Sequence, residues 1–396
     1  MWLTDLKLVL PDRVIKRGAI RLEAGLIAEI VEGKPSRAHP SSVIDGRGLT
    51  AIAGIVDIHG DMLERELEPR PGTMFPAKLA VLELDKRLAA SGITTAFAAV
   101  ALSDGPGLRS EARAKELIQT IHELRPLLGI DMLVHARFEV GTAISAPFLK
   151  DLLERDLVQM VSLMDHTPGQ GQFRDLETYV NYMVKWLGTD REQAENTVKA
   201  RLEESQNAPL AWNVGRDISQ LCLERGVALA SHDDDTSAKV NMMEGFGATI
   251  SEFPVTLEAA RAAKNKNMFV AMGAPNALRG GSHSGNLSAL EGIRAGVVDV
   301  LAADYYPAAL LQSAYKIARE NILPLENAMS LITNNAAQSA NLLDRGRLEL
   351  GLRADLVLIE ETEHPRVRAT FQKGRAVYSD GMIGVPNFLE VLVGTD

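Results

Sequence analysis

Several acidic residues and histidines stand where a strand-like run of apolar residues ends. The residues at the ends of IAGIVDIHG, IDMLVHARFEV, LVQMVSLMDH, VALASH and VDVLAADYY are His59 with Asp61, Glu139, His166, His232 and Asp304. Imidazole nitrogens and carboxylate oxygens suit Zn2+, Mn2+ or Fe2+, and a bridging carboxylate can hold two ions about 3.5–4 Å apart. Two such ions would polarise an oxygen and lower the pKa of a shared water. The pattern therefore predicts a hydrolase with one or two divalent ions, zinc being the first choice and Mn or Fe the alternatives.

Each of these residues has a plainer interpretation when it is taken alone. Asp61 could cap a helix that begins in MLERELE, and Glu139 could pair with Arg137. His135 competes with Glu139 for the metal, because it lies four residues earlier in the same strand with the same side-chain parity. The choice between His135 and Glu139 stays open. The recurrence of such residues at strand ends favours metal ligation for the set.

A second feature is the segment GAPNALRGGSHSGN at 273–286. Its glycines, hydroxyl groups, Arg279 and His283 lie between a strand-like run and a helical one, where backbone N–H groups and a helix N-terminus could bind a phosphate. An ordinary loop is the alternative, since the segment matches neither GxGxxG nor the Walker pattern. Arg137 and Lys239, which follow metal-bearing strands, would add anion contacts, although surface ion pairs are the default explanation for single basic residues.

The elements that must position these residues form a regular alternation. Eight strand-like runs alternate with helical stretches between residues 51 and 345, which implies a parallel sheet with right-handed crossovers. Eight is the number that closes a (β/α)8 barrel, whose active site lies at the carboxyl ends of the strands. A doubly wound open sheet is the alternative. The polar region 170–208 predicts a helical excursion above the barrel.

Both ends of the chain have a different texture. Residues 1–50 and 346–396 contain short alternating apolar runs with Gly and Pro between them and no helical period. We therefore expect one small β-rich domain assembled from 1–50 plus 346–396, with the barrel over 51–345.

Composition narrows the class of protein. The chain has 396 residues, a formal net charge of -10 and a single cysteine, Cys222, which fits a reducing compartment. Net negative charge argues against a general nucleic-acid-binding protein. No apolar run approaches the roughly 20 residues of a membrane helix, and the N-terminus has no signal-peptide pattern. We expect a soluble cytoplasmic protein that binds a small anionic substrate and neither nucleic acid nor membrane; a homo-oligomer is compatible with the sequence.

The order of these motifs resembles the amidohydrolase superfamily of metal-dependent hydrolases. The resemblance rests on the first-strand motif, the strand-end histidines, Asp304 and the closing segment TNNAAQSANLLDRGRLELGLRADLVLIE. It implies a (β/α)8 barrel beside a small β-sandwich made by the terminal segments. The chain departs from the usual HxH by having HGD at 59–61. Our strand count also places His166 and His232 after the fourth and fifth strands, where superfamily histidines usually follow the fifth and sixth.

One branch of the superfamily is similar over nearly the whole chain, through HGDMLERE, HARFEV, MDHTPGQGQF, ASHDDDT, GAPNALRGGSHSGN and ADYYP. This branch is the alpha-D-ribose 1-methylphosphonate 5-triphosphate diphosphatases of the carbon-phosphorus lyase pathway. The similarity implies hydrolysis of the triphosphate to the 5-phosphate and pyrophosphate. The alternatives are a cyclic amidase or deaminase on the same scaffold, and a non-catalytic component of a phosphonate pathway complex.

The resemblance also implies roles for individual residues. His59, Asp61 and His232 would hold metal. Glu139 stands where a bridging carboxylate is expected, and His166 would complete a second ion. The last-strand aspartate would bind metal, or orient the attacking water and take its proton. The expected contacts to the triphosphate are Arg137, Lys239, Arg279 and His283.

Overall fold

The computed structural model describes residues 1–35, 43–102, 107–141, 143–173, 175–187, 189–204, 208–282 and 285–384. The chain divides into two compact units. The first unit contains residues 1–96, 124–132 and 301–396, and the second unit contains residues 97–123 and 133–300. Within the described residues, no helix combines the length and the apolar character that a membrane span requires.

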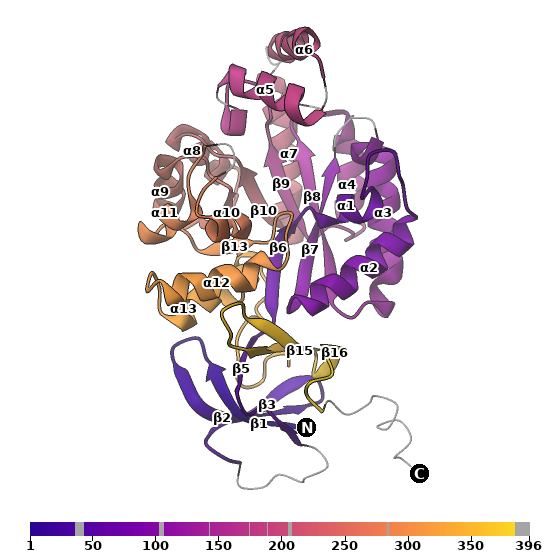
Figure 1. Cartoon of the computed structure of the whole chain (residues 1–396). Coiled ribbons are helices and arrows are strands. Elements are labelled where there is room, and N and C mark those ends of the chain that lie inside the picture. Colours follow the sequence, from indigo (N-terminus) through magenta and orange to yellow (C-terminus); the bar gives the residue numbers. More distant parts are fainter. Residues whose placement is uncertain are drawn as a thin grey trace. The chain divides into compact units, whose positions relative to one another are not determined.

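Strands from the two ends of the chain form one sheet in the first unit (Figure 1). Their order is β16-β15-β14-β5-β1-β2-β3, and β4 pairs with β1. Alternating apolar residues such as Leu3, Ile20 and Phe371 are fully buried in its core. This confirms that both termini contribute strands to one sheet, as predicted. The strands are β1 (Trp2–Val9), β2 (Val14–Glu23), β3 (Leu26–Glu32), β4 (Val43–Asp45), β5 (Leu49–Ala53), β14 (Leu356–Glu360), β15 (Arg366–Gln372) and β16 (Arg375–Ser379).

The eight strands between these ends form a second sheet whose order follows the sequence from β6 to β13. Its ladders β8–β9, β9–β10, β10–β11 and β11–β12 are all parallel. An isolated parallel bridge between Gly60 and Asp304 links the last residue of β6 to the segment that follows β13. The (β/α)8 fold class is thereby confirmed over the open-sheet alternative. The strands are β6 (Ile55–Gly60), β7 (Ile93–Leu102), β8 (Asp131–Glu139), β9 (Met160–Met164), β10 (Ala228–His232), β11 (Ile250–Glu252), β12 (Phe269–Gly273) and β13 (Val300–Ala302).

Helices follow the strands as the alternation predicts, and local capping fixes where some of them begin. The Thr236 hydroxyl accepts a hydrogen bond from the backbone N–H of Lys239, which starts α8 directly after the Asp run that follows β10. The helices are α1 (Met62–Leu67), α2 (Ala77–Ala90), α3 (Glu111–Leu124), α4 (Ala146–Glu154), α5 (Leu176–Leu187), α6 (Arg191–Glu204), α7 (Ala208–Arg225), α8 (Ser237–Gly245), α9 (Leu257–Asn265), α10 (Ala274–Arg279), α11 (Ala289–Arg294), α12 (Ala309–Arg319), α13 (Leu325–Ser330) and α14 (Asn334–Ser339).

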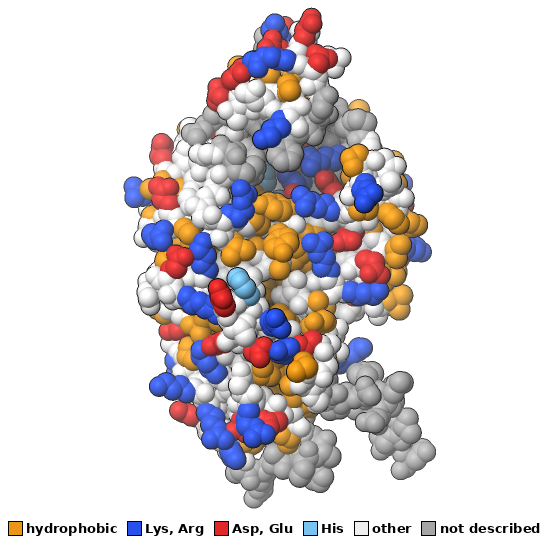
Figure 2. Space-filling model, in the orientation of Figure 1, with side chains coloured by type: hydrophobic (Ala, Val, Ile, Leu, Met, Phe, Trp, Pro, Cys, Tyr) orange, Lys and Arg blue, Asp and Glu red, His pale blue; other side chains and the backbone are white. Residues whose placement is uncertain are grey.

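The polar region after β9 forms the helix pair α5 and α6 in the second unit (Figure 1). Tyr179, Val180 and Met183 of α5 pack with Ala194 and Val198 of α6 in a small core of their own. On the face drawn in Figure 2, basic and acidic side chains are interspersed, so neither sign forms one continuous area.

Candidate metal centre

The first unit brings three of the predicted residues together where β6 and β13 end. The backbone N–H of Asp304 donates to the carbonyl oxygen of His59 (2.9 Å), and that of Asp61 donates to the carbonyl oxygen of Asp304 (2.8 Å). His59 is buried, and its Nε2 lies 3.4 Å from Asp61 Oδ1. Asp304 has a left-handed backbone (φ 55°), an uncommon conformation for a residue other than glycine. These backbone contacts fix the positions of one imidazole and two carboxylates.

Asp57 supports this arrangement and was not predicted from the sequence. It is fully buried, and its Oδ1 accepts hydrogen bonds from the backbone N–H of Ala303 (2.8 Å) and of His59 (3.2 Å). Burial raises the pKa of Asp57 to about 6, although the two N–H donors oppose the shift. A side chain at Gly60 would have its Cβ 2.9 Å from Asp57 Oδ2, which explains the glycine of the HGD motif. The strand parity shared by Asp57 and His59 was the available signal.

In the second unit, Glu139 and His166 form a close pair. Glu139 is the last residue of β8, and His166 lies two residues beyond β9. The Glu139 carboxylate accepts from the backbone N–H of His166 (2.9 Å) through Oε1, and its Oε2 lies 2.6 Å from Nδ1 of the same histidine. A carboxylate on Nδ1 fixes the ring and directs Nε2 toward a ligand.

Glu252, the last residue of β11, is a fully buried carboxylate that the sequence analysis missed. Its Oε2 accepts a hydrogen bond from Ser162 Oγ (2.7 Å) and lies 3.0 Å from Nδ1 of His232. The Ser162 hydroxyl uses its hydrogen in the bond to Glu252, so the hydroxyl oxygen accepts a hydrogen bond from Nε2 of His135 (2.6 Å). That bond leaves Nδ1 of His135 as the nitrogen with a lone pair. The signal available in the sequence was the apolar run ATISEF at 248–253, near whose end Glu252 stands.

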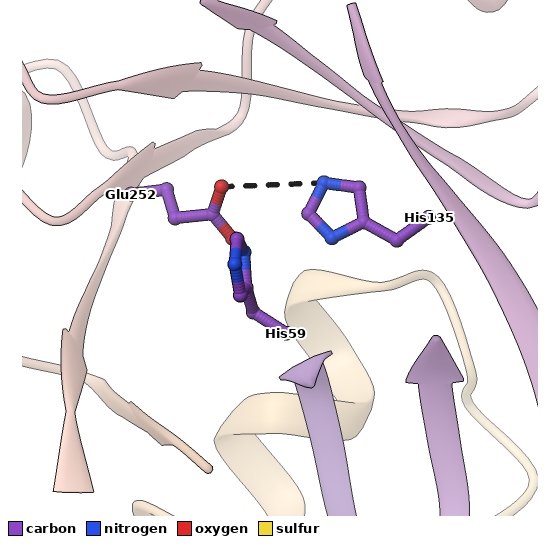
Figure 3. Close-up of side chains that lie close together, drawn as sticks. All are labelled: His59, His135 and Glu252. Atoms are coloured by element: carbon purple, nitrogen blue, oxygen red, sulfur yellow. Dashed lines mark ion pairs between the residues drawn. The ribbon is translucent and has the colours of Figure 1, made fainter. Parts of the chain in front are cut away.

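Figure 3 draws Glu252 with His135, whose Nε2 is 4.0 Å from Glu252 Oε2, and with His59. His135 and Glu252 both lie in the second unit, and each can offer a ligand atom to a metal ion. His135, kept as a competitor of Glu139, is therefore buried beside Glu252, whereas Glu139 contacts His166.

A group of residues able to hold a metal ion lies wholly within the second unit and consists of His166, His232 and Asp233. Asp233 follows β10, and the sequence analysis did not single it out. Among the described residues, the buried Asp233 Oδ2 has no hydrogen-bond partner. A buried carboxylate oxygen beside imidazole nitrogens is a donor set that suits Zn2+, Mn2+ or Fe2+. The residues present fit a divalent metal ion.

The residues predicted to bind the triphosphate are more dispersed. Lys239 lies beside the metal-binding group of the second unit, where its Nζ donates to the carbonyl oxygen of His232 (2.9 Å). Arg137 is buried in β8 and its Nε donates to Met164 Sδ (3.4 Å). Arg279 is exposed at the end of α10, a helix that occupies part of the segment expected to be a loop. His283 lies outside the described residues.

Comparison with known proteins adds a full-length relative. The chain is 38% identical over 389 residues to the alpha-D-ribose 1-methylphosphonate 5-triphosphate diphosphatase of Escherichia coli (strain K12), and the match covers 96% of this chain and 100% of that protein. It is 23% identical over 377 residues to the adenine deaminase of Clostridium perfringens, covering 92% of this chain and 56% of that protein. No family model matches the chain.

Solved structures agree on the fold. A solved amidohydrolase superposes with a TM-score of 0.61 at 14% identity, covering 96% of this chain and 99% of its own. The N-acetylglucosamine-6-phosphate deacetylase of Pasteurella multocida has a TM-score of 0.61 at 13% identity, covering 95% of this chain and 98% of its own. At such low sequence identity, these structural similarities show only that the folds are alike.

Proposed function

We propose that this chain, which belongs to the alpha-D-ribose 1-methylphosphonate 5-triphosphate diphosphatase family, hydrolyses that triphosphate to the 5-phosphate and pyrophosphate in phosphonate metabolism. The observation that carries the proposal is the 38% identity to the Escherichia coli diphosphatase over nearly the whole of both chains. The metal-binding groups support it, because hydrolysis of a phosphoric anhydride needs an activated water and stabilisation of charge on phosphate oxygens.

The proposed metal site is assigned residue by residue. A bound divalent ion supplies a water of lowered pKa and neutralises charge on the phosphate oxygens. We assign its site to the residues predicted from strand ends, with Glu139 contributing through its contact with His166. Zinc is the expected metal because imidazole and carboxylate both suit it. The assigned residues are His59, Asp61, Glu139, His166, His232 and Asp304.

Within this proposal Asp304 has the catalytic role. Its carboxylate takes a proton from the attacking water as the water oxygen bonds to phosphorus. The anhydride P–O bond breaks, and pyrophosphate leaves with the electron pair. The backbone hydrogen bonds that Asp304 exchanges with His59 and Asp61 support this role, because they hold the carboxylate in place. Arg137, Lys239, Arg279 and His283 remain the proposed triphosphate contacts.

The remaining expectations complete the proposal. We place the enzyme in the cytoplasm, since a chain whose one cysteine is Cys222 can form no internal disulfide, which fits a reducing compartment. We propose no nucleic-acid partner, because the formal charge is -10 and the surface charges are mixed on the face of Figure 2. We also propose that the chain forms a homo-oligomer. We propose a small domain of 1–50 plus 346–396 and a barrel of 51–345.

The test is to incubate purified, zinc-loaded protein with the ribose triphosphate and follow the products by phosphorus NMR. We expect pyrophosphate and the 5-phosphate in equal amounts, and almost none from Asp304→Asn. The matched control is Asp151→Asn, which alters an exposed aspartate of α4 and should turn over like the wild type. Release of orthophosphate instead, or no product from metal-loaded protein, would contradict the proposal. Ammonia released from adenine would favour the deaminase alternative.

A further inference from the structure

Asp233 occupies an unusual position directly after β10. Its backbone is left-handed (φ 52°), and its N–H donates to the carbonyl oxygen of Glu252 (2.9 Å). The loop after β9 approaches closely, since a Cβ at Gly171 would lie 3.3 Å from the Asp233 carbonyl oxygen and 3.4 Å from its Cβ. The side chain of Asp233 is only 9% exposed. The fold therefore holds this carboxylate in a fixed, buried place.

The three consecutive aspartates of this run have different environments. Asp234 Oδ2 accepts hydrogen bonds from the hydroxyls of Ser231 and Ser251, and Asp235 Oδ2 accepts from the backbone N–H of Gly171 (3.0 Å). Asp233 Oδ2 has no hydrogen-bond partner among the described residues, and neither has the second oxygen of Asp234, Oδ1. Burying a carboxylate oxygen is costly unless a hydrogen-bond donor or a cation compensates it. Among the described residues, Asp233 is the member of the run that belongs to a group able to hold a metal ion.

Two imidazoles face this oxygen. Asp233 Oδ2 lies 3.8 Å from Nε2 of His166 and 3.7 Å from Nε2 of His232. Both distances are too long for a hydrogen bond. The two rings are edge to face, with their centroids 5.7 Å apart, and the ring of His232 also packs edge-on against Phe253 at 5.6 Å. Three potential ligand atoms from two strand ends therefore surround one point.

In each of the two histidines, the other ring nitrogen, Nδ1, lies beside a carboxylate. Nδ1 of His166 is 2.6 Å from Glu139 Oε2, and Nδ1 of His232 is 3.0 Å from Glu252 Oε2. A neutral imidazole whose Nδ1 donates to a carboxylate carries its lone pair on Nε2, which is the arrangement of metal-bound histidines. Both lone pairs are then on the nitrogens that face Asp233.

The spacing is close to that of a bound ion. Ligand atoms roughly 2.0–2.1 Å from a tetrahedral ion are about 3.3 Å apart. The two measured separations from Asp233 Oδ2, 3.7 and 3.8 Å, would have to shorten by only about half an ångström. His166 is partly exposed on a loop, so its ring can make this adjustment.

We propose that His166, His232 and Asp233 together bind one divalent cation, and that Glu139 and Glu252 orient the two histidines without ligating that ion. This assignment makes Asp233 a ligand and gives Glu139 a positioning role in place of the bridging role expected for it. The inference deepens the proposed function and rests on it for the reaction that the ion serves. Metal binding itself is measured without substrate.

The test compares metal binding by chelator-treated protein and three variants. Zn2+ stoichiometry is measured by elemental analysis at buffered free Zn2+, and ligand geometry by the visible absorption of added Co2+. Asp233→Asn removes the charge but keeps a residue that tolerates the left-handed backbone. Asp235→Asn is the matched control, because it makes the same charge change two residues away. Glu139→Gln tests the positioning role.

We expect Asp235→Asn to bind Zn2+ like the wild type. Asp233→Asn should bind one equivalent more than about 100-fold more weakly, since it loses a ligand, and its Co2+ absorption should change. Glu139→Gln should keep the stoichiometry and lose about 10–100-fold in affinity, as is usual for a residue that orients a ligand. Wild-type affinity and Co2+ absorption in Asp233→Asn would overturn the proposal, as would loss of the whole equivalent in Glu139→Gln.

A second variant guards against misfolding. His166→Ala alters a partly exposed loop residue and should lose the same equivalent as Asp233→Asn, with an unchanged circular dichroism spectrum. Retention of that equivalent in His166→Ala would refute the shared site. A protein that binds this ion but releases no pyrophosphate would contradict the proposed function alone, whereas pyrophosphate release with no binding change in these variants would contradict the inference alone.

Discussion

Replacing Glu252 by Gln removes a charge from the interior of the site while keeping the size of the side chain. In the wild type, Ser162 Oγ and Nδ1 of His232 both reach the same oxygen, Oε2, at 2.7 and 3.0 Å. Glu252 is fully buried, so water cannot substitute for either contact. The amide oxygen of Gln can accept the same two hydrogen bonds, but as a neutral acceptor.

The magnitude follows from that change of acceptor. A hydrogen bond to a charged group contributes about 1.5–3 kcal/mol and a neutral one about 0.5–1.5 kcal/mol, so two bonds lose roughly 2 kcal/mol in total. If that loss falls on the metal-bound state, affinity for the ion held by His232 should drop about 30-fold, since 1.4 kcal/mol is tenfold. The weaker acceptor makes the imidazole a poorer donor to a cation.

The assay is competition for Zn2+ between the variant and a chromophoric chelator at fixed pH. Glu258→Gln is the matched control, because Glu258 caps Ser237 at the surface and no metal group includes it. We expect wild-type affinity for the control and about 30-fold weaker binding for Glu252→Gln. Unchanged affinity in Glu252→Gln would refute the argument that this carboxylate orients His232. Complete loss of the ion would show instead that Glu252 is itself a ligand.

Other predictions concern stability and catalysis. Asp131→Ala should lower the free energy of unfolding by about 3 kcal/mol in urea titrations. The substitution removes the carboxylate that the buried Arg345 and Arg353 contact at 2.6 and 2.5 Å. The control Asp151→Ala, at the surface, should change the free energy of unfolding by no more than about 0.5 kcal/mol. Burial raises the pKa of Asp131, but the guanidinium groups of Arg353 and Arg345 outweigh burial and hold this pKa below its ordinary value. The stabilisation is therefore present above about pH 4 and lost as the pH falls through the folded pKa, so the deficit of Asp131→Ala should shrink in urea titrations at lower pH. Asp304→Asn should lower kcat by about 10²–10⁴-fold in steady-state assays, because the general base is lost. Chelator treatment should abolish pyrophosphate release, and added Zn2+ should restore it.

The fold could be predicted because its signals are local and repeated. All eight barrel strands coincide with the apolar runs in the sequence, and the strand ends at His59 and His232 lie where the runs stop. The structure also agrees with the count that puts His166 after the fourth strand and His232 at the end of the fifth. The sixth strand, β11, ends in Glu252.

The candidate site was harder to predict because residue type does not separate a metal ligand from a residue that orients one. Glu139 ends a barrel strand and has the chemistry of a ligand, yet both of its oxygens contact His166. Glu252 likewise engages its Oε2 with a hydroxyl and an imidazole. Asp233 looked like one of three interchangeable aspartates. Its left-handed backbone and its place beside His166 and His232 distinguish it. These differences arise from contacts between strands that are distant in sequence.

Hydrogen-bond satisfaction supplies the distinction that residue type lacks. A carboxylate oxygen that already accepts from protein donors has less lone-pair density for a cation and is better suited to polarise an imidazole. By this criterion Glu139 and Glu252 back the two histidines, while Asp233 Oδ2, which has no hydrogen-bond partner among the described residues, faces the nitrogens that those histidines leave for metal. Each imidazole then has one carboxylate that orients it, and the cation compensates the negative charge of the remaining carboxylate, Asp233.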